Sequence, residues 1–367
     1  MKLECRYYND SSCRSCEGLE IGLDQWQKQS LDQLQKLLVT PNWLAPKLSN
    51  KSFGSRNKVK LAVGGCLDRP FIGRFTSAGE VIDLEHCQLH SELIQSKVSS
   101  AYQWIKDFKL EPYNTQTRKG ELKSIIIVEG DNQSLMIRFV LRSKESVDRI
   151  RNLATLLCEE HPDYVVSVNI QPKPSATLEG DEEILLSEKS LLDISYNDRV
   201  LKLPTKSFVQ TNHEVASKLY QTAGDWTKDM SGRFLELFCG IGGFSSHLIK
   251  SDREMVGIEL SRSAIEAAQI ATPSTEFISM DAWEYLKSSS QFDTIIVNPP
   301  RRGLGNDICQ RLNSIKAKYI LYSSCNPDTL RKDLENLNYK IEKIQAFEMF
   351  PLTSHWEVLT LLSLDQE

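Results

Sequence analysis

The chain has 367 residues, of which 40% are hydrophobic and 25% are charged, and its net charge is −5 at pH 7. These values are typical of a globular protein of about two domains. The acidic total argues against a protein that coats nucleic acid through a global basic field, but it is compatible with a local basic face. No apolar run approaches the ~20 residues of a membrane span, and no secretory signal is visible, so we expect a cytoplasmic monomer without membrane contact.

Residues 1–200 are predicted to form a mixed α+β domain. Amphipathic periodicity predicts three helices, over 23–38, 89–110 and 147–160. Runs rich in β-branched residues predict four strands, over 59–65, 124–130, 135–142 and 165–172. The acidic segment 177–185 is expected to be a turn or the tip of a hairpin.

Residues 201–367 are predicted to form an α/β domain with a doubly wound parallel sheet. Short apolar runs predict buried strands over 233–238, 254–260, 276–280, 292–298 and 319–324. Helical spacing between them is visible near 247–250 and over 263–271 and 307–317. The last two strand-like runs, 340–350 and 357–364, have no convincing helix between them, which predicts an antiparallel hairpin at the sheet edge.

Three motifs in this second half predict a nucleotide-like cofactor site. The segment 236–244 (ELFCGIGGF) follows a predicted strand and precedes a helix, and Gly240 begins the glycines that bring the backbone close to a ligand. Glu259 ends the next strand, where a carboxylate can accept hydrogen bonds from ribose hydroxyls. Asp281 follows the third strand and is placed to read an adenine amino group. Each motif alone is ambiguous, but in this order they resemble a class I (Rossmann-like) methyltransferase domain.

Two further motifs close the fourth and fifth predicted strands. NPPRRG spans 298–303, and SSCNP spans 323–327 with Cys325 at its centre. Ligands of open α/β sheets lie beyond the carboxyl ends of the strands, so Cys325 is expected to face the same crevice as the glycine loop. Pro327 stops the strand and leaves Cys325 on an exposed corner.

The whole set of motifs resembles the RNA uridine-C5 methyltransferases over nearly the full chain. The motifs that carry the resemblance are FVQTN (208–212), LFCGIGGF (237–244), Glu259, NPPRRG (298–303), SSCNP (323–327) and MFPLTSHWE (349–357). Within the family the chain most resembles the compact, iron–sulfur-bearing members that act on 23S ribosomal RNA.

The resemblance implies a role for each matching residue. Cys325 would be the nucleophile and Glu357 the general base. Phe208 would stack on the target base, and Asn298 would contact both the base and the methyl donor, S-adenosylmethionine. The other residues implied to line the donor site are Gln210, Phe238, Gly240, Glu259 and Asp281. Asn298 departs from the aspartate that many members carry; its amide can still accept a hydrogen bond from uracil N3–H, and it can also donate one.

The chemistry of the implied reaction explains why a cysteine and a base are needed. Carbon 5 of uracil is a poor nucleophile, and addition of a thiolate to carbon 6 turns the ring into an enolate that can accept a methyl group. A base must then remove the proton from carbon 5 so that the thiolate can leave.

Four of the nine cysteines form a separate candidate site near the N-terminus. Cys5, Cys13 and Cys16 open the chain, and Cys87 follows in LEHCQLH; four thiolates can hold either zinc or a [4Fe–4S] cluster. The resemblance favours the cluster, because iron–sulfur-bearing members have cysteines at the matching positions. Its expected role is structural.

Basic and aromatic residues of the first domain suit contact with RNA phosphates and bases. The basic ones include Arg56, Lys58, Lys60, Arg138 and Arg142, and the aromatic ones Trp43, Phe53 and Tyr113. The expected partner is RNA, specifically 23S ribosomal RNA. Two other functions remain open from the residues themselves: an amino-group methyltransferase that uses the NPP corner, and a non-catalytic iron–sulfur RNA-binding protein.

Overall fold

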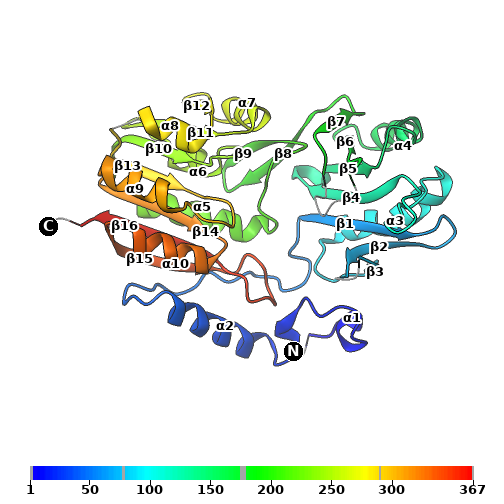
Figure 1. Cartoon of the computed structure of the whole chain (residues 1–367), viewed down its shortest axis with the longest axis horizontal. Helices are drawn as coiled ribbons and strands as arrows, with labels where there is room; N and C mark the ends of the chain where they lie inside the picture. The colour runs from blue at the N-terminus through cyan, green and yellow to red at the C-terminus, as the bar shows by residue number, and fades with distance from the viewer. Residues whose placement is uncertain (1–2, 77–78, 174–178, 289–290, 366–367) are drawn as a thin grey trace.

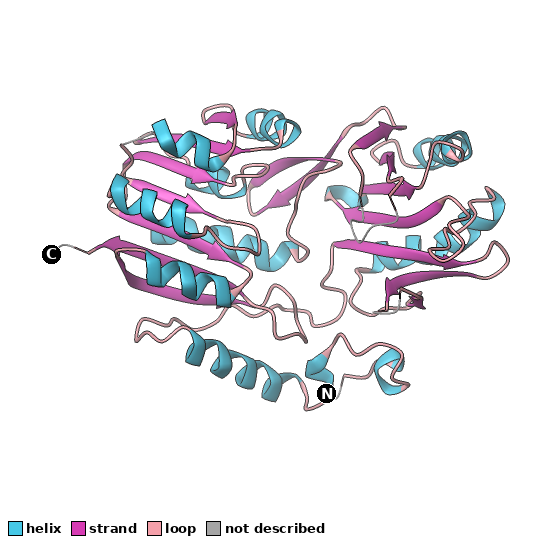
Figure 2. Cartoon of the chain, in the orientation of Figure 1, coloured by secondary structure: helices cyan, strands magenta, loops and turns pink. Residues whose placement is uncertain are grey.

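The computed structural model describes residues 3–76, 79–173, 179–288 and 291–365, and in these residues two seven-stranded sheets lie side by side (Figure 1). Both sheets have helices packed on them, as the colouring by secondary structure makes visible (Figure 2). In the described part of the chain, no helix is long and apolar enough to cross a membrane.

The first sheet is mostly antiparallel and has the strand order β3-β2-β1-β4-β5-β6-β7, in which only the β5–β6 pair is parallel. Helices α3 (Glu92–Asp107) and α4 (Val147–Glu160) share one apolar core with it. The strands are β1 (Lys58–Gly65), β2 (Pro70–Phe75), β3 (Val81–Asp83), β4 (Leu122–Glu129), β5 (Leu135–Leu141), β6 (Val165–Ile170) and β7 (Glu182–Leu185).

The predictions for this half are confirmed for three helices and four strands, and in part for the acidic segment. Strands β6 and β7 pair antiparallel, as a hairpin requires, but residues 182–185 belong to strand β7 itself because their backbone pairs with β6. Glu183 of β7 also accepts hydrogen bonds from Arg138 of β5. Residues 177–178 of that segment lie outside the described residues. Strands β2 and β3 were not predicted.

The second sheet has the order β12-β11-β10-β13-β14-β16-β15, and its strands from β12 to β14 are parallel. The order reverses between β10 and β13, which makes the ends of these two strands the switch point where ligands of such sheets bind. The strands are β10 (Gly232–Leu237), β11 (Arg253–Glu259), β12 (Glu276–Ser279), β13 (Thr294–Val297), β14 (Tyr319–Ser324), β15 (Tyr339–Phe347) and β16 (Glu357–Leu364).

The connections of the second sheet are helices, as the alternating pattern predicts, and the final hairpin is antiparallel. The hairpin differs from a simple edge addition, because β16 pairs with β14 and leaves the earlier strand β15 at the edge. The helices are α6 (Gly243–Leu248), α7 (Arg262–Ala271), α8 (Ala282–Ser288), α9 (Asn306–Ile315) and α10 (Pro327–Asn336).

A two-stranded hairpin, β8 (Leu191–Tyr196) and β9 (Arg199–Pro204), lies between the two sheets (Figure 1). Helix α5 (His213–Trp226) packs against the second sheet and contacts α6, β16 and the hairpin. The inward residues of the hairpin belong to one core cluster with side chains of both sheets. The boundary predicted near residue 200 falls within β9 and stays a prediction.

The N-terminal segment runs along the foot of both sheets (Figure 1). It contains α1 (Arg6–Asn9), the short 3₁₀ helix η1 (Glu17–Leu19) and α2 (Leu23–Leu37); a second 3₁₀ turn, η2 (Asp131–Gln133), joins β4 to β5. Near α1, the Tyr7 hydroxyl accepts a hydrogen bond from the backbone N–H of His86. Helix α2 instead packs against α10, and Gln27 donates a hydrogen bond to Glu348 over 2.7 Å. The same segment therefore contacts both halves of the molecule.

Candidate active site

The glycine loop after β10 is held in a tight turn at the switch point. Gly240 and Gly242 have φ values of +54° and +81°, which favour glycine. Phe238 also has a positive φ, +60°, a rare conformation for a bulky residue that occurs mostly where a site fixes the backbone. A Cβ on Gly243 would lie 2.5 Å from the Tyr220 hydroxyl, so this position is limited to glycine by packing.

Beside this loop lies a small cavity of about 50 Å³, here called the donor cavity. Four of the residues predicted to bind the methyl donor line it, namely Gln210, Phe238, Gly240 and Asn298, and Phe208 lines it as well. Its volume is far below the 300 Å³ or more of a pocket that encloses a whole drug-sized ligand, so it can enclose only one end of a nucleoside-sized molecule.

The carboxylate of Glu236 is buried under the donor cavity. It accepts hydrogen bonds from the backbone N–H and the hydroxyl of Ser245, the first of them over 2.8 Å. Burial raises the pKa of Glu236 to about 7, and these hydrogen bonds offset part of the rise. A carboxyl group with this pKa exchanges its proton near neutrality and can pair with a ligand cation.

The other two acidic residues predicted at the site lie outside the donor cavity. Glu259, at the end of β11, accepts hydrogen bonds from the backbone N–H groups of Gly240 and Ser261, at 3.3 and 3.0 Å. Asp281 is exposed and accepts from the N–H of Trp283 over 2.9 Å, so its carboxylate caps the start of α8. Both lie at carboxyl ends of neighbouring strands, along the surface that leads away from the cavity.

The NPPRRG loop is fixed to the sheet by a carboxylate of α10. Asp333 accepts hydrogen bonds from the N–H of Leu304 over 2.8 Å and from the hydroxyl of Tyr322 over 2.6 Å. A Cβ on Gly303 would lie 2.5 Å from Asp333, and its φ of +77° also favours glycine. This support holds Asn298 beside the donor cavity and Arg301 three residues further on.

Cys325 lies between the end of β14 and the start of α10, as the strand-stopping Pro327 predicts, but it is half-buried rather than on a fully exposed corner. It lines a second cavity of about 330 Å³, here called the cysteine-325 cavity. The other walls of this cavity come from the NPPRRG loop, the loop before β16, and α2; they include Arg301, Asn326, His355, Ser30, Gln33 and Leu37.

Glu357 stands at the level of Cys325 on the neighbouring strand. The antiparallel register ends with the pair Ser324 and Val358, and residues 325 and 357 are the next ones along the two segments. The side chain of Glu357 is 1% exposed and accepts a hydrogen bond from the Ser323 hydroxyl. Burial raises its pKa to about 7, which suits a proton acceptor working near neutral pH.

The electrostatics of Cys325 reflect the same neighbours. Burial raises the pKa of its thiol, and the charge of Glu357 raises it further. Arg301 partly offsets this rise through its positive charge and a hydrogen bond to the thiol. Arg301 is thus a functional residue that the sequence reading passed over, although it stands in a motif that was singled out.

The predicted residues do not all border one cavity. Cys325 lines the cysteine-325 cavity, whereas Gln210, Phe238 and Asn298 line the donor cavity. The NPPRRG loop connects the two, because Asn298 faces one and Arg301 the other.

Phe208 is 66% exposed and borders the donor cavity, so its ring is accessible to a base. The ammonium of Lys58 lies 5.8 Å from the centre of this ring. Arg138, by contrast, is 3% exposed and is bound to Glu179 and Glu183 over 2.7 Å each, so it cannot contact RNA as the sequence suggested.

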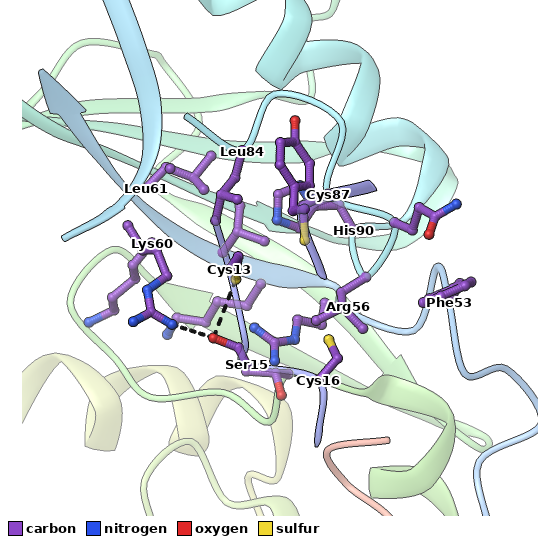
Figure 3. A pocket seen from close by; sticks show the side chains of 18 of the residues that line it. Cys13, Ser15, Cys16, Phe53, Arg56, Lys60, Leu61, Leu84, Cys87 and His90 are labelled. Carbon is purple, nitrogen blue, oxygen red and sulfur yellow. Dashed lines mark hydrogen bonds between the residues drawn. The ribbon is translucent and has the colours of Figure 1, made fainter. Parts of the chain in front are cut away.

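The four N-terminal cysteines line one further cavity, of about 420 Å³, next to Arg56 and Lys58. Cys13, Cys16 and Cys87 surround the same space in Figure 3. Burial raises the pKa of the Cys16 thiol to about 12, and the neighbouring Cys87 adds to the rise. Within the described residues, no three His, Cys, Asp or Glu side chains are arranged to hold a single metal ion.

Comparison with known proteins shows the family to which the chain belongs. A family model described as tRNA (Uracil-5-)-methyltransferase matches residues 181–285 and 277–364. The chain is 40% identical to the 23S rRNA (uracil(747)-C(5))-methyltransferases RlmC of Shewanella baltica (strain OS185) and Proteus mirabilis (strain HI4320). These alignments cover 99% of the chain and 97% and 100% of the two relatives. The chain belongs to the RNA uracil-C5 methyltransferase family.

A solved structure of the family agrees in fold. The Pyrococcus abyssi tRNA (uracil-54, C5)-methyltransferase, in complex with S-adenosyl-L-homocysteine, matches with a TM-score of 0.79 and 26% identity over 93% of this chain and 83% of that chain. The predicted family, the α/β fold with a Rossmann-like sheet and the enzyme class are therefore confirmed, with S-adenosylmethionine as the methyl donor. Amino-group methylation and a non-catalytic role are both excluded by this membership.

Some walls of the two cavities were not predicted from the sequence. The walls contributed by α2 and by Tyr196 and Tyr220 depend on contacts between segments far apart in the chain. No local motif marks them, whereas Glu236 is visible in the sequence as the acidic residue that heads the glycine loop.

Proposed function

We propose that this enzyme methylates carbon 5 of a uridine in 23S ribosomal RNA through a covalent bond between Cys325 and carbon 6 of the base. The observation that carries the proposal is the proximity of a half-buried thiol just after β14 to a buried carboxylate, Glu357, at the start of the adjacent strand β16. A thiol and a proton acceptor on adjacent strands are the two groups that methyl transfer to a pyrimidine carbon requires.

The donor site is proposed at the switch point. Gln210, Phe238, Gly240 and Asn298 bind the methionine end in the donor cavity, while Glu259 binds the ribose. Asp281 lies further out and binds the adenine through the carboxylate oxygen that does not cap α8. When bound, S-adenosylmethionine supplies a methyl group on a sulfonium, and the neutral thioether sulfur is the leaving group.

Cys325 starts the reaction as a thiolate, which the guanidinium of Arg301 stabilises. Its electron pair forms the bond from sulfur to carbon 6, and the π electrons of the ring become an enolate with negative charge on carbon 5. Asn298 holds the uracil edge through its amide, and Phe208 stacks on the ring. Carbon 5 then takes the methyl group, and the electrons of the broken bond remain on the donor's sulfur.

Glu357 completes the reaction by taking the proton from carbon 5. The double bond between carbons 5 and 6 re-forms, the bond to sulfur breaks, and Cys325 leaves as a thiolate. A carboxyl group with a pKa of about 7 accepts this proton more readily than one of ordinary pKa, since its conjugate base is stronger.

The substrate assignment rests on the relatives and on the charge around Phe208. Relatives that match nearly end to end carry names that specify uracil 747 of 23S rRNA. Arg56, Lys58 and Lys60 lie near Phe208 along the 420 Å³ cavity and can bind phosphates beside the flipped uridine. We propose that the enzyme acts as a monomer.

We further propose that Cys5, Cys13, Cys16 and Cys87 hold a [4Fe–4S] cluster that ties the N-terminal segment to the first sheet. All four line one cavity, so their thiols border a common space. Four thiolates are the ligand set that such a cluster takes. No step of methyl transfer involves it.

The substrate proposal is tested by incubating the enzyme with S-adenosylmethionine and unmodified 23S ribosomal RNA, and by mapping the product with mass spectrometry. We expect one 5-methyluridine, at the position matching uracil 747, and none with Cys325→Ala. Methylation of transfer RNA alone, or at another 23S position, would contradict the assignment.

The cluster proposal is tested by measuring iron and sulfide in protein purified without oxygen. We expect about four of each per chain, lost in Cys16→Ser and retained in the control Cys158→Ser, whose half-buried thiol lies outside the cavity. Zinc in place of iron, or full iron in Cys16→Ser, would refute it.

A further inference from the structure

Tyr196, the last residue of β8, has a buried hydroxyl group without a partner. The residue is 1% exposed, and its hydroxyl oxygen has no hydrogen bond within the structure. Buried hydroxyls nearly always have a partner, because leaving one unpaired costs about 1–3 kcal/mol. An unpaired one at a ligand site therefore points to a group that the ligand supplies.

Tyr196 is also one of the residues that line the donor cavity. Its ring is fixed there by edge-to-face contacts with Tyr220 and His213, at centroid distances of 5.2 and 5.5 Å. In addition, its backbone carbonyl lies 3.1 Å from Nε2 of His247. The Tyr196 side chain is thus held beside the cavity by an aromatic cluster, and the hairpin between the two sheets brings it there.

The charges around the donor cavity indicate which group the hydroxyl meets. No lysine, arginine or histidine is among the residues that line it, whereas Glu236 is. The amino-acid end of the methyl donor carries an ammonium and a carboxylate. Glu236 can pair with the ammonium, so the side-chain donors left for the carboxylate are neutral: the hydroxyls of Tyr196 and Tyr220 and the amides of Gln210 and Asn298. Among these, the Tyr196 hydroxyl is the one that is buried without a hydrogen-bond partner in the described part of the chain.

We infer that the Tyr196 hydroxyl donates a hydrogen bond to the carboxylate of the donor's methionine portion and so selects ligands that carry it. This inference rests on the donor site proposed above. Tyr196 is a specificity-determining residue in this role. Burial keeps the pKa of its hydroxyl well above the ordinary value, so it remains a donor throughout the working pH range.

Two ligands that differ only in the carboxylate test the inference by isothermal titration calorimetry. S-adenosylhomocysteine has it, and S-adenosyl-3-thiopropylamine lacks it while keeping the amine. We expect Tyr196→Phe to weaken S-adenosylhomocysteine binding by about tenfold or more, the size expected for a hydrogen bond to a charged group. Its affinity for the amine analogue should equal that of the wild type.

Thermal unfolding without ligand separates this role from a structural one. Tyr196→Phe removes an unpaired hydroxyl, so the variant should unfold at or above the wild-type temperature. The matched control is Tyr339→Phe. The Tyr339 hydroxyl donates a 2.9 Å hydrogen bond to the carbonyl of Ala317, and the residue does not line the donor cavity. The control should unfold at a lower temperature and bind both ligands normally.

Equal binding of S-adenosylhomocysteine by Tyr196→Phe and the wild type would overturn the inference, as would an equal loss for both ligands. Failure of the donor site itself has a different signature. Glu259→Ala should weaken both ligands alike, because both retain the ribose. Unchanged affinity for both in that variant would contradict the donor site rather than the role of Tyr196 alone.

Discussion

The two sheets bury carboxylates in opposite ways. In the first sheet, Glu183 lies beside Arg138, which donates two hydrogen bonds to it, and Ser167 and Asn169 donate two more. In the second sheet, Glu357 has a serine as its partner and no cation. Burial acts on both groups, but the pKa of Glu183 is lowered because Arg138 outweighs it, whereas that of Glu357 is raised to about 7.

This difference teaches that burial alone does not identify a site. A buried charge whose partners are complete contributes to the fold, while one left with neutral partners is kept in a state that chemistry can use. The contrast also follows the topology. The Arg138 network lies within a mostly antiparallel sheet, and Glu236, Glu357 and Tyr196 lie near the carboxyl-terminal ends of parallel strands or beside them.

The largest expected effect is on catalysis by Cys325→Ala. Removal of the nucleophile should lower kcat by about 10⁴-fold or more, since no other group can add to carbon 6. The unfolding temperature should stay within about a degree of the wild-type value, as the side chain is half-buried at a cavity wall. Single-turnover methylation and thermal unfolding measure the two quantities, and appreciable residual activity would break the contrast between the sheets.

Glu357→Gln should be slower by about 10²- to 10⁴-fold, because the proton on carbon 5 then has no acceptor. The variant should also accumulate the covalent RNA complex that the wild type resolves. In the wild type, activity should rise with pH through about 7, where Glu357 loses its proton. Quantifying the complex on denaturing gels checks this, and a variant that turns over normally without a complex would rule out Glu357 as the base.

Arg138→Ala should produce the reverse pattern. It leaves the partly buried Glu183 without its cation and leaves Glu179 with Lys60 alone, which should cost about 3–5 kcal/mol of unfolding free energy. The folded fraction should retain the wild-type kcat, because the network lies outside both cavities. Urea unfolding measures the free energy, and an assay of activity per folded molecule measures kcat. A variant of wild-type stability with a lowered kcat would contradict the division between structural and functional charges.

The smallest effects are expected for Glu236→Gln and Glu183→Gln, which should change the unfolding free energy at pH 8 in opposite directions. Glu236 has a pKa raised from 4.5 to about 7 in the folded state, so its ionisation costs stability as pH rises through that window. Glu236→Gln should therefore be more stable than the wild type at pH 8, by on the order of 1–3 kcal/mol, and equal to it at pH 4.

Glu183→Gln should change stability in the opposite direction. The pKa of Glu183 is lowered in the folded state, so its ionised form contributes stability above the unfolded pKa, which is lost as pH falls. The variant should be less stable than the wild type at pH 8, and the difference should shrink in acid. Stability curves at both pH values compare the pair, and equal signs would contradict the assigned pKa directions.

The sequence was sufficient to predict what depends on local pattern. Strand β14 and the break after it at Cys325 follow from an apolar run and one proline, and the glycine loop follows from its spacing. The final hairpin was also predictable. The order of its two strands was not predictable, because β16 lies between β14 and β15 only through its pairing with β14. The half-burial of Cys325 was not predicted either.

The remaining features depend on contacts between distant segments. Helix α2 was predicted as a helix, but its position against the cysteine-325 cavity is set by long-range bonds such as that from Trp356 to Ser30. Arg138 was read as a surface cation because its partners Glu179 and Glu183 lie more than 40 residues away. The unpaired hydroxyl of Tyr196 becomes visible only when the hairpin is folded between the sheets.

The most direct test of the covalent mechanism uses RNA that contains 5-fluorouridine at the target position. Fluorine cannot leave as a proton, so the methylated adduct cannot break down. With S-adenosylmethionine present, the wild-type enzyme should form a complex that survives denaturation, and peptide mapping should locate the bond at Cys325. An adduct at another residue, its formation by Cys325→Ala, or its absence from an enzyme that methylates normal RNA would contradict the account.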